Sequence, residues 1–138
     1  MNCKISQYIE SFLGTSDTNN QKDVDVISDF NDLMQYIETK SIAHQDELNK
    51  DSNLKNIDIG FSFCLQNNKS ELYQIGISKS GWLIIRIKPE PTKIYKSKIK
   101  QTNHDLVAFY LPGWRDIPKH DLLPENEAKP ILEHITQL

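Results

Sequence analysis

Two His-Asp dipeptides are the residues whose types and spacing best suggest chemistry. His104 precedes Asp105, and His120 precedes Asp121. Such pairs supply ligands for metal-dependent phosphoester hydrolysis, but that chemistry needs further His and Asp ligands on buried helices, whereas both dipeptides fall in expected loops. We therefore interpret them as surface residues and expect no metal site.

The remaining reactive side chains do not suggest a catalytic arrangement either. His44 and His134 have no Glu or Cys at zinc-ligand spacing. Cys64 lies in an apolar stretch, where a free thiol acts as a small hydrophobic residue, and no candidate base is near it in the sequence. The five glycines form neither a phosphate-binding loop nor a dinucleotide fingerprint. We expect a protein that is not an enzyme and that has no catalytic residues and no cofactor.

Charge is segregated along the chain, although the net charge is only -3. Residues 15–51 contain nine acidic residues and three lysines, which gives -6. Residues 79–100 contain seven basic residues and one glutamate, which gives +6. Two solvated faces that neutralise each other would explain this pattern, and so would an interface for a partner of opposite charge.

The basic segment leaves a nucleic-acid-binding or regulatory module open as an alternative function. Aromatic residues lie among its lysines, and aromatic rings in a basic groove can stack on bases. The isoelectric point near 5.8 provides no long-range attraction to phosphate, so nucleic acid is the less favoured partner. The lysines in question are Lys93, Lys96, Lys98 and Lys100.

The N-terminal residues that would position these groups predict two elements. Apolar residues recur at helical spacing over Ile5–Leu13, which predicts a short first helix that ends near Gly14. Polar loop-forming residues follow, and Val24–Ile27 then predicts a brief extended run.

A second helix is expected to open at Ser28. Its apolar face would lie within Phe30–Ile37, and Asp29 and Asp32 would place negative charge in the first turn, where the helix dipole favours it. Residues 44–56 are polar and are expected to be irregular or the frayed end of this helix.

The centre of the chain predicts an antiparallel meander. Apolar residues alternate over Ile57–Leu65 and Tyr73–Ile77, and a more uniformly apolar strand follows at Trp82–Ile87. Gly81 can take the positive φ that the second turn requires. Trp82 is expected in the core, and the lysine-rich segment up to Lys100 is expected to be an edge strand or an exposed loop.

Two further strands and a last helix are expected near the C-terminus. The strands cover Leu106–Leu111 and Trp114–Ile117, with a turn at Pro112 and Gly113 between them. Pro124 would introduce the helix. Pro130 predicts that this helix either bends or begins near Asn126.

Length and composition limit the architecture of the chain. A chain of 138 residues fits one domain covering residues 1–138. With 38% hydrophobic and 25% charged residues and a mean hydropathy of -0.55, it is too polar for a membrane protein and too apolar for a disordered one. We predict a cytoplasmic α+β protein with an antiparallel sheet of about four to six strands and two or three helices packed on it.

Three stretches of the sequence carry a resemblance to a protein family. They are Val24–Ile37, Ile57–Ile87 with Gly81 and Trp82 leading its third strand, and Phe109–Pro118 followed by Leu123–Ala128. Their order resembles the α+β immunity proteins of bacterial polymorphic-toxin and contact-dependent growth-inhibition systems, most nearly the first of the numbered immunity families. The resemblance covers about residues 24–138.

The resemblance implies an inhibitor that binds a cognate toxin domain and occludes its active site. Toxins of this kind include nucleases and deaminases with basic clefts, which an acidic surface would both attract and fill. On this interpretation the toxin-binding residues would be the surplus acids around the second helix, with two aromatic residues as anchors. These residues are Asp23, Asp25, Glu38, Asp46 and Glu47, together with Tyr36 and Trp114.

Overall fold

The protein has the predicted α+β fold. The computed structural model describes residues 3–8, 21–50, 58–99, 104–110 and 114–137. Its α-helices are α1 (Phe30–Lys50) and α2 (Glu125–Gln137), and a 3-10 helix, η1 (Lys119–Asp121), precedes α2. Its strands are β1 (Cys3–Tyr8), β2 (Gln21–Ile27), β3 (Phe61–Gln66), β4 (Leu72–Ser78), β5 (Gly81–Lys88), β6 (Lys93–Ile94), β7 (Leu106–Tyr110) and β8 (Trp114–Pro118). Within these residues, neither helix has both the length and the apolarity needed to cross a bilayer.

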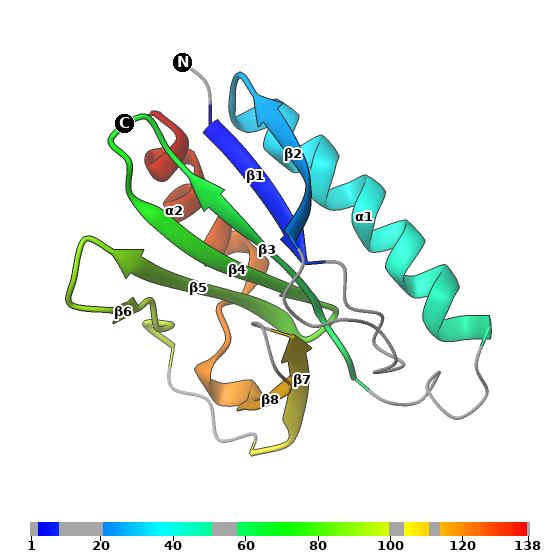
Figure 1. Cartoon of the computed structure of the whole chain (residues 1–138). Helices are drawn as coiled ribbons and strands as arrows, with labels where there is room; N and C mark the ends of the chain where they lie inside the picture. The colour runs from blue at the N-terminus through cyan, green and yellow to red at the C-terminus, as the bar shows by residue number, and fades with distance from the viewer. Residues whose placement is uncertain (1–2, 9–20, 51–57, 100–103, 111–113, 138) are drawn as a thin grey trace.

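One antiparallel sheet carries both helices. Its strands are in the order β2-β1-β3-β4-β5-β6, so the predicted meander β3-β4-β5 is confirmed and the N-terminal hairpin β1-β2 extends it. Figure 1 shows α1 and α2 behind this sheet and the separate hairpin β7-β8 at its base. Gly81 has the positive φ expected of it, 152°, in the turn between β4 and β5.

The alternation of residues along the strands divides the apolar side chains between the two faces. On one face, side chains such as Phe63, Ile75 and Ile84 are fully buried in the main core with Leu33 of α1 and Leu132 of α2. The predicted core positions of Trp82 and Cys64 are confirmed, because their exposed fractions are 5% and 6%.

The second core lies on the opposite face, beneath the hairpin β7-β8. Phe109 of β7 is fully buried there with Leu83 and Leu122. A Cβ atom added to Gly60 would lie 2.2 Å from Phe109 Cε1, and one added to Gly76 would lie 2.7 Å from Phe109 Cδ1. The two glycines therefore make the space that this phenylalanine fills.

The predicted first helix is wrong. Residues 3–8 form strand β1, which pairs with both β2 and β3, while residues 9–13 lie outside the described part of the chain. Ile5 is completely buried between its neighbours in the sheet. The side chain of Cys3 is buried as well, so the alternation at Cys3 and Ile5 obeys the period of a strand.

Helix α1 begins where expected and continues further than expected. The Asp29 carboxylate accepts a hydrogen bond from the Asp32 N–H at 2.9 Å, and the Asp32 carboxylate accepts bonds from the N–H and the hydroxyl of Ser28. These two bonds from Ser28 lower the pKa of Asp32. At the other end, residues 44–50 are helical, and buried Leu48 packs this last part of α1 onto the protein.

Helix α2 follows Pro124, as predicted, and contains Pro130 in its interior. The helix begins at Glu125, directly after Pro124, whose carbonyl accepts hydrogen bonds from Glu127 and Ala128. Pro130 is exposed, so the carbonyl four residues earlier can be solvated instead of bonded. Three of the four predicted apolar positions of this helix, Ala128, Leu132 and Ile135, are buried.

Candidate functional site

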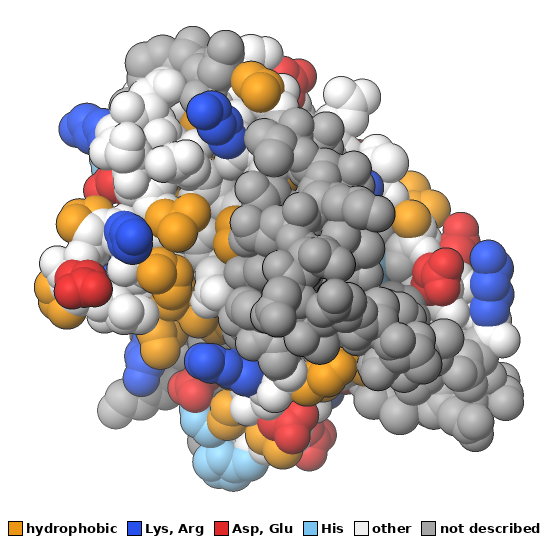
Figure 2. All heavy atoms as spheres, viewed as in Figure 1, with side chains coloured by type: hydrophobic (Ala, Val, Ile, Leu, Met, Phe, Trp, Pro, Cys, Tyr) orange, Lys and Arg blue, Asp and Glu red, His pale blue; other side chains and the backbone are white. Residues whose placement is uncertain are grey.

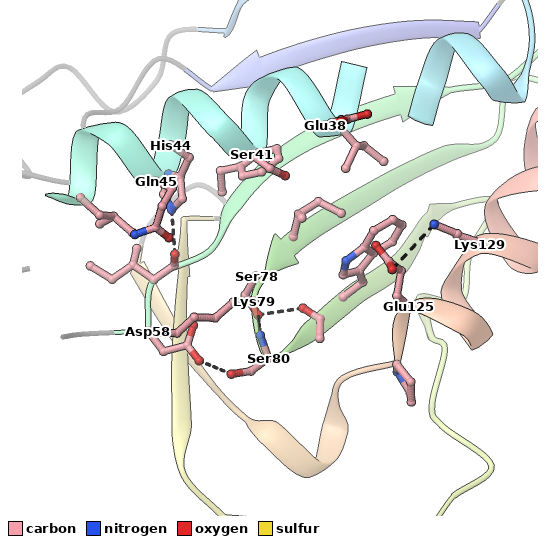
Figure 3. Close-up of a pocket in the computed structure, with 18 of the residues that line it drawn as sticks. Glu38, Ser41, His44, Gln45, Asp58, Ser78, Lys79, Ser80, Glu125 and Lys129 are labelled. Carbon is pink, nitrogen blue, oxygen red and sulfur yellow. Dashed lines mark hydrogen bonds and ion pairs between the residues drawn. The ribbon is translucent and has the colours of Figure 1, made fainter. Parts of the chain in front are cut away.

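A groove lies between α1 and α2 among the described residues. Its volume is about 740 Å³. Phe61, Ile77 and Trp82 of the sheet line its floor, the C-terminal half of α1 forms one wall, and the first turn of α2 forms the other. Figure 3 shows polar side chains pointing toward this space from all three elements. An apolar floor with a polar rim is the usual composition of a binding site.

The helices leave this groove because they cover different parts of the sheet. α1 extends for 21 residues, whereas α2 has 13 and begins beside Trp82. The Trp82 N–H and carbonyl both bond to Leu123, at 2.9 and 2.8 Å, which holds the start of α2 against β5. The sheet beneath the C-terminal half of α1 therefore has no second helix over it.

Internal bonds engage a carboxylate at each end of the groove. At one end, the Ser80 hydroxyl donates a hydrogen bond to Asp58, and Lys119 Nζ lies 3.6 Å from the same carboxylate. At the other end, Lys129 Nζ lies 3.7 Å from Glu125. Both carboxylates have a structural role, which distinguishes them from Glu38 on the α1 wall.

His44 lies in the wall of the groove as a neutral side chain. Its Nε2 donates a hydrogen bond to the Ile59 carbonyl at 2.7 Å, and its ring packs against Phe61 with 5.5 Å between ring centres. Burial lowers the pKa of His44, and the Ile59 carbonyl and the charge of Glu47 only partly oppose this effect. His44 therefore joins α1 to the segment that leads into β3.

The lowered pKa makes this contact sensitive to acid. A histidine that is harder to protonate in the folded state stabilises the fold fully above its ordinary pKa of 6.5 and loses that contribution as the pH falls below it. We expect His44→Gln to weaken the dependence of the free energy of unfolding on pH below about 6.5. Urea denaturation at several pH values measures this, with the exposed His134→Gln as the matched control. Equal slopes for the two variants would contradict the prediction.

Three side chains form a stripe along the outer side of α1. Glu38, Ile42 and Asp46 follow one another at intervals of four residues, which places them on one side of a helix. Ile42 has an exposed fraction of 59%, and both acids are exposed. No hydrogen bond or ion pair engages Glu38 or Asp46 within the described residues. We call these three residues the α1 stripe; it borders the groove through Glu38.

The predicted toxin-binding residues do not all share this side of the helix. Tyr36 and Glu47 lie about 160° and 180° around α1 from Glu38, at about 100° per residue. The Tyr36 ring packs edge-on against Phe63, with 5.2 Å between ring centres. Tyr36 is therefore a core-edge residue, and only Glu38 and Asp46 of the four candidates on α1 are brought together.

The other three candidates are elsewhere. Asp23 and Asp25 belong to β2, and their side chains lie outside the described part of the structure. Trp114 begins β8 and is 41% exposed. It belongs to the hairpin β7-β8 on the face of the sheet opposite the helices, so α1 and Trp114 do not form one surface.

The lysine-rich segment forms only a short edge strand. β6 pairs with β5 through two residues, and the chain then bonds to α2, where Glu127 accepts hydrogen bonds from the Ser97 hydroxyl and the Lys98 N–H. Lys93 Nζ lies 4.5 Å from the centre of the Tyr95 ring, and that ring packs on the main core. Trp82 is buried on the helix side, so its ring is not displayed as a stacking platform.

Comparisons with family models, curated proteins and solved structures gave no match. The immunity-protein resemblance stays a prediction. The candidate site therefore depends on the groove and the α1 stripe.

Proposed function

We propose that this protein is an immunity-type inhibitor, which binds a cognate toxin domain and occludes its active site. The observation that carries the proposal is the α1 stripe, an isoleucine that is 59% exposed between two acids that lack partners among the described residues. A large exposed apolar residue on a rigid element can serve as an interface anchor, and charges around it direct the approach of a partner.

The groove lies beside the α1 stripe, because Glu38 belongs to both. A partner that packs on Ile42 can extend past Glu38 toward the apolar floor formed by Phe61, Ile77 and Trp82. Such a partner would present a large apolar side chain with lysine or arginine beside it. A toxin whose active site binds phosphate has basic residues at its entrance, so the same acids would attract the toxin and cover that entrance.

Co-expression tests this function directly. An immunity gene is expected beside the gene of its toxin, so the gene for the protein is expressed together with a toxin domain encoded next to it, and cell survival and a purified complex are the two measurements. We expect survival and a complex of the two chains. Cell death together with the absence of a complex would contradict the proposal. The alternative, nucleic-acid binding by the lysine-rich segment, predicts a mobility shift of RNA or DNA that weakens at high salt.

The two acids of the α1 stripe should set the rate of association. We expect Glu38→Ala with Asp46→Ala to slow toxin binding and to flatten its dependence on ionic strength, because long-range attraction acts mainly on the association rate. Stopped-flow or surface-plasmon measurements at several salt concentrations give both quantities.

The matched control is Asp116→Ala with Glu133→Ala. It removes two exposed acids from β8 and α2 and changes the net charge by the same amount. If both double variants behave alike, the effect belongs to total charge, and the α1 stripe is not the contact.

A further inference from the structure

The hairpin β7-β8 brings together two histidines that are 16 positions apart in the sequence. The rings of His104 and His120 have centres 5.0 Å apart and planes at 80°. Figure 2 shows histidine side chains grouped at the lower edge of the sheet face opposite the helices, by this hairpin. His104 is exposed and His120 is partly exposed, so solvent reaches the pair.

The backbone holds the two histidines at this separation. Leu106 and Pro118 are the last paired residues at the open end of the hairpin, and the Lys119 N–H donates a hydrogen bond to the Asp105 carbonyl at 2.7 Å. His104 directly precedes Asp105, and His120 directly follows Lys119, so the two histidines lie one residue beyond this hydrogen bond. His120 belongs to a single 3-10 turn, Lys119–Asp121, which follows β8 and brings its ring against that of His104.

We propose that His104 and His120 form a binding site for a divalent transition-metal ion such as Zn²⁺. Two imidazoles that share one tetrahedral Zn²⁺, each with a nitrogen about 2.1 Å from the metal, have ring centres about 5 Å apart. The observed separation of the ring centres therefore matches that of two imidazoles that share one ion. Imidazole nitrogen is a preferred ligand of Zn²⁺, Cu²⁺ and Ni²⁺, whereas Mg²⁺ and Ca²⁺ prefer oxygen.

The charges around the pair suit a cation. Asp121 Oδ1 lies 3.5 Å from His120 Nε2, where a carboxylate can orient a metal-binding imidazole. Lys119, the lysine next to His120 in the sequence, is paired with Asp58. No group of three or more His, Cys, Asp and Glu side chains among the described residues is placed to hold a metal. The site consequently has two protein ligands, and water would complete the coordination.

This site is separate from the proposed inhibitor function. It lies on the hairpin, whereas the groove and the α1 stripe lie on the helix side of the sheet. It also departs from the expectation that the His-Asp dipeptides are isolated surface residues. Their juxtaposition depends on the register of β7 and β8, which the spacing of the residues does not reveal.

Calorimetric titration of the untagged protein with ZnCl₂ tests the proposal. We expect one Zn²⁺ per chain, no binding of Mg²⁺, and at least about tenfold weaker Zn²⁺ binding for His104→Ala and for His120→Ala, since even outer-shell changes cost about that much. His134→Ala, which removes an exposed histidine from α2, should bind Zn²⁺ like the unchanged protein. Absence of Zn²⁺ binding, or unchanged binding by both hairpin variants, would overturn the proposal.

A second measurement covers the case in which a variant does not fold. Proton NMR of the wild-type histidine rings during the ZnCl₂ titration should show shifts for His104 and His120 and none for His44 or His134. Shifts at His44 or His134 without shifts at the hairpin pair would place the metal elsewhere and refute the site.

Discussion

Phe109→Ala is expected to lower the free energy of unfolding by about 3–5 kcal/mol, the usual effect of truncating a buried phenylalanine. Phe109 has no exposed surface, and it is the largest side chain of the second core. Gly60 and Gly76 have no side chains that could move into the vacated volume. The cavity should therefore stay open, which favours the upper part of this range.

Leu106→Ala is the matched control on the same strand. Leu106 is 54% exposed, so its truncation should change the free energy of unfolding by less than about 1 kcal/mol. Urea or thermal denaturation followed by circular dichroism compares the two variants. A loss for Phe109→Ala no larger than that for Leu106→Ala would show that the hairpin does not pack on the sheet as described.

The glycines provide an independent version of the same experiment. In Gly76→Ala, the new methyl group would lie 2.7 Å from Phe109 Cδ1 and 3.3 Å from Leu83 Cβ, so the hairpin would have to shift. Overpacking of this kind typically costs about 1–3 kcal/mol. Combining Gly76→Ala with Phe109→Ala should be less destabilising than the sum of the two, because each change relieves the defect that the other creates.

The sequence predicts the central meander because its strands are short and local. Residues in β3 and β4 alternate, β5 is more uniformly apolar, and tight turns connect the three strands, so the pairing follows from neighbouring residues. The N-terminal segment misled the prediction because Ile5 fits both a helical and an alternating pattern when the window is short. Pairing of β1 with β3, about 60 positions later, decides between them, and local spacing carries no information about that contact.

The candidate site was predictable only in part for a related reason. The surplus of acids on α1 is visible in the sequence, but their distribution around the helix becomes clear only when the helix is known to reach Lys50. With residues 44–56 expected to be either irregular or the frayed end of the helix, the positions of Glu38 and Asp46 on either side of Ile42 were not fixed. Extension of α1, secured by Leu48, creates the stripe that charge counting missed.

Ile42→Lys is expected to weaken toxin binding at least about thirtyfold, equivalent to about 2 kcal/mol, if the α1 stripe is the contact with a basic toxin. The change removes the apolar anchor and places a positive charge between Glu38 and Asp46, where it would neutralise the acids and repel the partner. Stability should change by less than about 0.5 kcal/mol, because the side chain is 59% exposed and lysine favours helices.

Ile99→Lys is the control with the same chemical change. Ile99 is 56% exposed and lies in the lysine-rich segment, away from α1. It should leave toxin binding within about twofold of the unchanged protein. A substitution outside the contact changes neither the apolar anchor Ile42 nor the charges that attract the toxin. If Ile42→Lys binds as tightly as Ile99→Lys while the unchanged protein protects cells, inhibition is real but uses another surface. The exposed Trp114 on β8 would then be the next anchor to replace, because its hairpin lies on the opposite face of the sheet.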